Sequence, residues 1–308
     1  MRALLVANPK ATATTARGRD VLFRALGSEL KVDVAETQRR GHAIELGRQA
    51  TADGIDIVVA LGGDGTVNEV INGMLAAGPG QQVPMLAVVP GGSTNVFSRA
   101  LGVSRNPVEA TSELLDALRG GRSRLLSLGR ADERWFTFTA GLGLDAQAIR
   151  TVERKRLAGR RATPTMFVNA ALSEYLLRSD RRRPTITLTR PGRPDVPHLY
   201  LGIVTNTVPW TYFFDRPVHV TPKATFETGL DLFAMRRLGL LPTTRAALGM
   251  LHAAGHGPRG RAVLQEHDLH DFTLSATRPL AFQVDGDYLG ERECVHFTAH
   301  RDALRVVV

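Results

Sequence analysis

Cysteine is almost absent from this chain of 308 residues, which contains a single one, Cys294. One cysteine cannot form an intrachain disulfide, so the class of disulfide-stapled secreted domains is excluded, and a reducing compartment fits the composition. Because free cysteine usually behaves as a small apolar side chain, we expect Cys294 to pack in the core.

Long apolar runs are missing as well. No stretch approaches the roughly 18 apolar residues that are typical of a transmembrane helix. The apolar segment at residues 3–7 leads directly into Asn8-Pro9 and is too short for the core of a signal peptide. The sequence therefore predicts a cytoplasmic protein whose association with the inner face of a membrane would be peripheral.

Acidic residues are the minority among the charged ones, 30 against 39 Lys and Arg, which gives a net charge of +9. This excess favours anionic partners such as nucleotides, nucleic acid or anionic phospholipid. The basic residues are scattered and no aromatic–glycine binding motif accompanies them, so we expect no specific nucleic-acid partner. Three basic clusters, at residues 154–156, 160–161 and 181–183, form either a solvated face or a patch for an anionic membrane.

The segment at residues 55–75 is the most informative one that the chain does contain. Its first seven residues are nearly all apolar and rich in β-branched side chains, which predicts a buried parallel strand. The sequence GGDGT follows at residues 62–66, and apolar residues then recur with helical spacing, at Val67, Val70, Ile71 and Met74. The segment is therefore a strand, a glycine turn and a helix.

A glycine turn before a helix is suited to binding an anion. Glycines let backbone N–H groups approach a ligand, and the start of a helix carries partial positive charge. An ordinary tight turn needs one glycine, whereas Gly62, Gly63 and Gly65 surround an acid here. The pattern predicts a phosphate or nucleotide loop, and Asp64 suggests Mg²⁺ or a reacting hydroxyl nearby.

The order of predicted elements defines the fold class. Strands and helices alternate up to about residue 124, which predicts a parallel α/β nucleotide-binding domain over residues 1–124. Short strands bounded by Gly, Pro or Asp dominate residues 125–300 and predict an antiparallel β-sandwich domain. The apolar strand near residues 301–308 is expected to return to the first domain. Ligands of parallel sheets bind at the carboxyl ends of strands, so we expect the motifs there to face a cleft between the domains.

Seven motifs occur in order along nearly the whole chain. They are Asn8-Pro9, Thr37 with GHA at 41–43, LGGDGTVNEVING at 61–73, PGGSTNVFSRALG at 90–102, GLGLDA at 141–146, PKATFETGLDLF at 222–233 and QVDGD at 283–287. This ordered set resembles the bacterial diacylglycerol kinase family of lipid kinases, relatives of the sphingosine kinases. The glycine loop alone would be less specific, because NAD kinases and phosphofructokinases have similar loops.

The resemblance implies that ATP, with Mg²⁺, phosphorylates the hydroxyl of a lipid alcohol at a membrane surface, most directly diacylglycerol to give phosphatidic acid; a homodimer is compatible with it. It implies a structural Mg²⁺ held by Asp231 with the backbone of Thr228 and Phe233. The catalytic carboxylates would be Asp287, at the position of the family's general base, together with Asp64 and Asp285. The nucleotide-binding residues would be Asn8, Thr37, Gly62, Gly63, Asp64, Gly65, Thr66, Asn68, Glu69, Gly92, Ser93 and Asn95.

Three positions depart from the family pattern. Val96 and Thr228 each replace an acid, and Asp287 replaces a glutamate. The shorter side chain of Asp287 must reach the hydroxyl from about 1.5 Å further back or through a water. These departures leave two alternatives open, a nucleotide-binding regulatory protein with weakened catalysis and an NAD-kinase-like or other small-molecule kinase. The Asp-Gly-Asp sequence at residues 285–287 is also typical of a simple hairpin turn.

Overall fold

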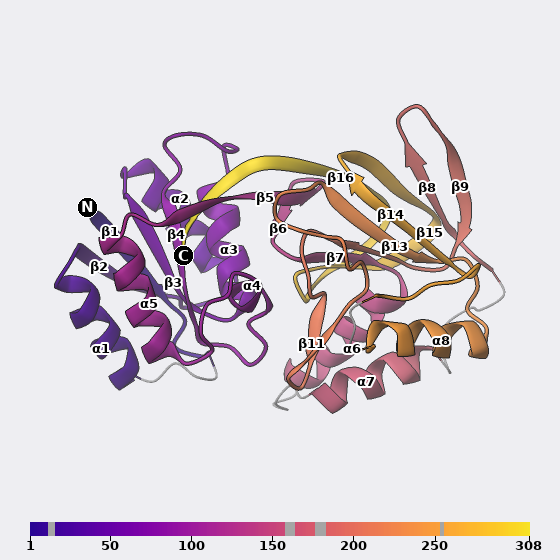
Figure 1. Ribbon diagram of the computed structural model, residues 1–308, viewed down its shortest axis with the longest axis horizontal. Helices are drawn as coiled ribbons and strands as arrows, with labels where there is room; N and C mark the ends of the chain where they lie inside the picture. Colours follow the sequence, from indigo (N-terminus) through magenta and orange to yellow (C-terminus); the bar gives the residue numbers. More distant parts are fainter. Residues whose placement is uncertain (12–15, 158–163, 176–182, 253–255) are drawn as a thin grey trace. The chain divides into compact units, whose positions relative to one another are not determined.

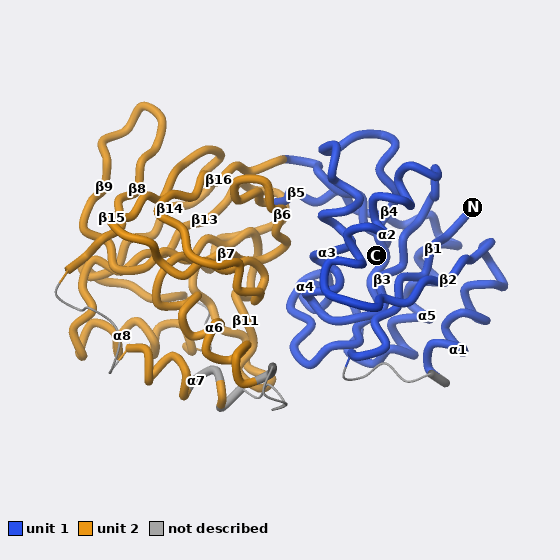
Figure 2. The backbone as a smooth tube through the Cα atoms, turned by 180° about the vertical axis from the view of Figure 1, so that it is seen from behind, with its two compact units in different colours: residues 1–128, 301–308 blue, residues 129–300 orange. Residues whose placement is uncertain are grey.

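The chain of the computed structural model divides into two units (Figure 2). Unit 1 comprises Met1–Leu128 with Arg301–Val308, and unit 2 comprises Gly129–His300. The structure describes residues 1–308 except 12–15, 158–163, 176–182 and 253–255. Within the described residues, no helix is long and apolar enough to cross a membrane.

Unit 1 is built on a parallel sheet with the strand order β4-β3-β1-β2, and the end of β16 runs parallel to β4 through the pair Val306 and Leu86. Its strands are β1 (Arg2–Ala7), β2 (Lys31–Glu36), β3 (Ile57–Gly62), β4 (Met85–Pro90) and the end of β16 (Asp287–Val307). Its helices are α1 (Ala16–Gly27), α2 (His42–Ala52), α3 (Asp64–Met74), α4 (Val96–Ala100) and α5 (Pro107–Arg119).

Alternation along these strands gives the sheet two buried faces. Leu5 and Val59 pack with Leu26 of α1 and Leu114 of α5 in one core. Successive side chains of a strand point to opposite faces, so the fully buried Val58 points away from that core, toward the face where α2 and α3 pack together (Figure 1). Such two-sided burial explains why the strands are apolar runs rather than alternating ones.

Unit 2 is built on an antiparallel sheet with the strand order β14-β13-β10-β7-β15-β16 (Figure 1). Its strands are β5 (Ser123–Ala131), which begins in unit 1, β6 (Arg134–Phe136), β7 (Thr139–Leu142), β8 (Ile186–Arg190), β9 (Arg193–Leu199), β10 (Gly202–Thr205), β11 (Thr211–Phe213), β12 (Arg216–Val218), β13 (Leu230–Met235), β14 (Val263–Leu269), β15 (Asp271–Val284) and most of β16. Its helices are α6 (Leu144–Leu157), α7 (Pro164–Ser173) and α8 (Leu240–Met250). The parallel region followed by an antiparallel one confirms the predicted fold class.

Two cores lie on the two faces of this sheet. Val204 and Leu232 belong to one core, and their neighbours Ile203 and Phe233 belong to the other, which also contains Ala246 of α8. The same period-2 alternation contradicts the prediction for Cys294, which is exposed. Its neighbour Val295 points into the core, so the cysteine on the same strand points outward.

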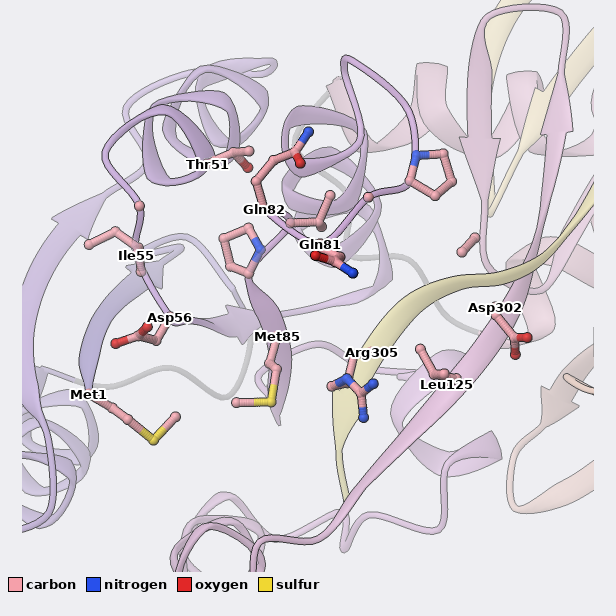
Figure 3. A pocket seen from close by; sticks show the side chains of 16 residues that line it. Met1, Thr51, Ile55, Asp56, Gln81, Gln82, Met85, Leu125, Asp302 and Arg305 are labelled. Atoms are coloured by element: carbon pink, nitrogen blue, oxygen red, sulfur yellow. The ribbon is translucent and has the colours of Figure 1, made fainter.

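A recess of about 810 Å³ lies in unit 1 (Figure 3). Met1 precedes β1, Asp56 precedes β3 and Met85 begins β4, and all three line it together with Leu125 and Arg305. These residues mark the amino ends of the parallel strands. The recess is therefore at the edge of the sheet opposite to the carboxyl ends, where the predicted phosphate loop begins.

Candidate active site

The glycine loop and the loop after β4 lie backbone against backbone. The Gly91 N–H donates to the Gly62 carbonyl at 2.8 Å. A Cβ placed on Gly92 would lie 2.7 Å from the Cα of Gly63, closer than real Cβ contacts come. The absence of side chains on both residues is what lets the two loops meet, so residues 62–66 and 90–95 form one continuous surface at the carboxyl ends of β3 and β4.

Asp64 joins the same two loops through its side chain. Its carboxylate accepts hydrogen bonds from the Val96 and Phe97 N–H groups, each at 3.0 Å. These are backbone N–H groups at the start of α4, which no carbonyl of the helix can satisfy. The Asp64 carboxylate, on α3, therefore caps α4, a role that the sequence did not indicate. Its expected role beside the phosphates stays a prediction.

The ends of β1 and β2 are tied to α3. The Asn8 amide donates to the Thr66 hydroxyl at 3.0 Å, and the Thr37 N–H donates to the Ala7 carbonyl at 2.9 Å. The Glu69 carboxylate accepts from the Gly41 N–H at 2.8 Å, at the start of α2. Residues that sequence reasoning placed at the nucleotide therefore lie at one edge of the sheet, joined by these bonds.

The second loop contributes one buried and one exposed polar residue. Asn95 has a positive φ of 49°, and its amide both accepts from the Gly92 N–H and donates to the Gly92 carbonyl, at 2.9 Å each. Asn95 thus closes the turn, and Ser93 at its tip is exposed to solvent. Asn68 is only 1% exposed and accepts from the Asn72 amide, and its expected nucleotide contact stays a prediction.

The candidate carboxylates of unit 2 lie on the hairpin between β15 and β16. Asp285 and Gly286 have φ values of 47° and 83°, and Val284 pairs with Asp287. Two central residues with positive φ make the tight turn typical of an Asp-Gly hairpin. The hairpin interpretation of residues 285–287 is therefore correct, and Asp287 stands at the first position after the turn.

The Asp285 carboxylate holds a neighbouring segment. It accepts from the backbone N–H groups of Thr137, Phe138 and Thr139 and from the Thr137 hydroxyl, at 2.8 to 3.0 Å. Asp285 is 4% exposed, and burial raises the pKa of its carboxyl while the four hydrogen bonds oppose that rise. Asp285 therefore anchors residues 137–139, and the catalytic role that we expected for it stays a prediction.

Asp145, in the first turn of α6, forms a second link to the hairpin. The side-chain NH₂ group of Gln283 donates to the Asp145 carboxylate at 2.8 Å, and the side-chain oxygen Oε1 of Gln283 accepts from the Gly286 N–H at 3.0 Å. Burial raises the pKa of Asp145 to about 6, against the lowering effect of the Gln283 hydrogen bond. Sequence reasoning noted the motif GLGLDA but not this connection, because residues 145 and 283 meet only in the folded sheet.

The expected structural metal site at Asp231, Thr228 and Phe233 does not fit Mg²⁺. That ion needs an octahedral cage of oxygen ligands, several of them waters. The Asp231 carboxylate is instead 2.7 Å from Nδ1 of His267, accepts from the Asp268 N–H at 3.1 Å and is buried. Among the described residues, no group of three or more His, Cys, Asp or Glu side chains could hold a metal. The Asp231–His267 pair occupies the place where we expected the ion.

Comparisons with known proteins found similar sequences and similar structures. The family model of the diacylglycerol kinase catalytic domain matches residues 2–130. A diacylglycerol kinase of Bacillus subtilis is 25% identical over 94% of this chain and 90% of its own. A diacylglycerol kinase of Staphylococcus aureus is 32% identical over 40% of this chain and 37% of its own. The crystal structure of a diacylglycerol kinase from Bacillus anthracis superposes with a TM-score of 0.71 at 18% identity, covering 99% of this chain and 96% of that one, which shows the shared fold. Over residues 2–130, this chain is therefore similar to the diacylglycerol kinase catalytic domain.

Proposed function

We propose that this protein is an ATP-dependent lipid kinase that transfers the γ-phosphate of ATP to the hydroxyl of a lipid alcohol, with diacylglycerol as the first substrate to test. The observation that carries the proposal is the backbone-to-backbone meeting of residues 62–66 and 90–95 at the start of α3. Glycine loops at a helix start present N–H groups to phosphates and favour negative charge. Phosphoryl transfer depends mainly on such positioning and charge stabilisation.

The roles of the individual residues follow from their places. The N-terminus of α3 and the exposed Ser93 would bind the phosphates of ATP, and Mg²⁺ arriving with ATP would neutralise part of their charge. Asn8 and Thr66 would hold the ends of β1 and β3 in position through their hydrogen bond, and Glu69 would hold the start of α2 through its bond to Gly41. Asp287 would accept the proton of the attacking lipid hydroxyl.

A lipid alcohol lies in a bilayer, so the kinase would work at a membrane surface, with anionic phospholipid as the partner that its net charge of +9 favours. The basic clusters first considered for this contact lie partly outside the described residues, at 160–161 and 181–182; of the others, Arg154 and Arg183 are exposed. Cytoplasmic localisation with peripheral binding is the arrangement that we propose.

The test is a transfer assay with γ-labelled ATP, Mg²⁺ and mixed micelles that contain diacylglycerol. We expect labelled phosphatidic acid, and we expect Asp287→Asn to lower turnover by at least ~100-fold because the base is lost. Asp287→Glu should retain activity, since it restores the longer carboxylate that the family uses. Asp302→Asn is the matched control on the same strand, because Asp302 is an exposed residue of β16 with a φ of 50° that asparagine adopts readily.

No labelled product with diacylglycerol or with a panel of other lipid alcohols would reject the lipid-kinase proposal. Binding of ATP without transfer to any alcohol would instead support a nucleotide-binding regulatory protein. Transfer to NAD or to a sugar in preference to a lipid would support a small-molecule kinase.

A further inference from the structure

Helix α8 in unit 2 presents an apolar face to solvent. Leu240, Leu241 and Leu248 are each between 65% and 79% exposed, and Leu251, directly after the helix, is 44% exposed. With 3.6 residues per turn, these four leucines and the exposed Thr244 fall within an arc of about 100°. Single exposed leucines are ordinary, but a continuous apolar stripe on a solvent face needs an explanation.

The opposite side of α8 packs on a core of unit 2 and holds the helix in place. Ala246 is buried, and it packs with Met250 against Phe233 and Met235 of β13. A surface helix normally turns its apolar stripe to the core and its charges to water. Helix α8 has an apolar side on the core and a second apolar side on the solvent, so the exposed leucines are not needed to hold the helix in unit 2.

The charges around the helix have one sign. No Asp or Glu occurs between Asp231 and Glu266 in the sequence. The same segment contains five arginines, all of them exposed, at positions 236, 237, 245, 259 and 261. A run of 34 residues without an acid is unusual in a chain that has 30 acids among 308 residues. The segment that carries the exposed leucines is therefore basic, which favours an anionic partner.

We propose that α8 is the membrane-docking face of this protein, with Leu240, Leu241, Leu248 and Leu251 entering the outer part of an anionic bilayer and the five arginines contacting lipid phosphates. Helices with leucines on one face and basic residues beside them bind at the interface of anionic membranes. A few leucine side chains also fall short of the roughly 800 Å² per partner that a stable protein–protein interface buries. The choice of a bilayer rests on the proposed function, since a lipid substrate requires one.

The test is sedimentation of the full chain with vesicles of phosphatidylglycerol and phosphatidylcholine. We expect binding to the mixed vesicles and much weaker binding to pure phosphatidylcholine. The pair Leu241→Gln and Leu248→Gln should lower the partition coefficient at least ~10-fold, because the side chains no longer enter the apolar region. The pair Arg236→Gln and Arg237→Gln should lower it about 30-fold at low salt and much less at high salt.

Val108→Gln on α5 is the matched control, since Val108 is an exposed apolar residue of unit 1, and it should bind vesicles like the wild type. An unchanged partition coefficient in the leucine pair would overturn the proposal. So would a dimer, seen by sedimentation velocity, that the leucine pair dissociates, because the face would then join two copies of the chain.

A kinase assay on a short-chain, water-soluble diacylglycerol separates this inference from the proposed function. The leucine pair should match the wild type on the soluble substrate and lose activity on vesicles, because only the second reaction requires docking. Vesicle binding that depends on α8 without any kinase activity would retain the docking face and reject the lipid kinase. Kinase activity on vesicles that is equal in the leucine pair and the wild type would retain the kinase and reject the docking face.

Discussion

Replacing Asp64 by asparagine tests whether the acid of the glycine loop is a structural cap, a functional carboxylate or both. The two carboxylate oxygens accept the Val96 and Phe97 N–H groups at 3.0 Å each. An asparagine keeps one acceptor and turns an NH₂ group toward the other N–H, so one charge-assisted bond is lost and one donor is left unpaired. A hydrogen bond to a charged group contributes about 1.5 to 3 kcal/mol, and we expect Asp64→Asn to destabilise unit 1 by about 2 to 3 kcal/mol.

The matched control is Asn106→Ala at the start of α5. The Asn106 side chain accepts from the Val108 N–H at 3.0 Å, so its loss removes a helix cap away from the glycine loop at a cost of about 1 kcal/mol. Urea unfolding followed by circular dichroism gives the two free energies of unfolding. The transfer assay, run where each variant is fully folded, gives turnover and the KM for ATP.

We expect Asn106→Ala to turn over normally and Asp64→Asn to lose at least ~100-fold. If Asp64→Asn unfolds at the wild-type urea concentration, the two hydrogen bonds do not stabilise α4 as the geometry implies. If it is destabilised yet turns over like the control, Asp64 is only a cap and its catalytic role is refuted.

Two further predictions concern the half-buried Asp145 and a glycine contact. The pKa of Asp145 is raised from 3.8 to about 6, so the folded protein binds more protons than the unfolded one between these values and stability should fall by up to about 3 kcal/mol as pH rises through this window. Asp145→Asn should flatten that part of the profile, measured as urea midpoints from pH 4 to 6.5; an equal slope in both proteins would contradict the assignment. Gly92→Ala would bring a Cβ to 2.7 Å from the Gly63 Cα and should raise the KM for ATP at least ~10-fold by separating the loops. Gly27→Ala, where no atom lies within 4 Å, should leave the KM unchanged, and equal values in both variants would show that the loop contact does not shape the ATP site.

Apolar runs and glycine positions were enough to predict the first half of the fold. The strand over residues 55–61 and the helix after GGDGT are β3 and α3, because burial on both faces leaves an apolar run and helical packing leaves a 3.6-residue period. The second half was less complete. Short strands were predicted throughout residues 125–300, but β15 runs unbroken from Asp271 to Val284. Short exposed strands such as β9 carry no apolar alternation from which their bounds could be predicted.

The sequence by itself determined the glycine turn and the helix that follows it, since turn glycines and helix-forming residues act through neighbours only a few positions away. Only the tertiary structure decided what the acids do. Asp64 caps α4 from 32 positions away, Asp285 anchors residues 137–139, and Asp145 reaches Gln283 across 138 positions. It also decided that four leucines of α8 face solvent. The role of a carboxylate depends on the hydrogen-bond donors around it, and the role of a leucine depends on whether it is buried or exposed. In a folded chain, residues distant in sequence decide both the donors and the burial.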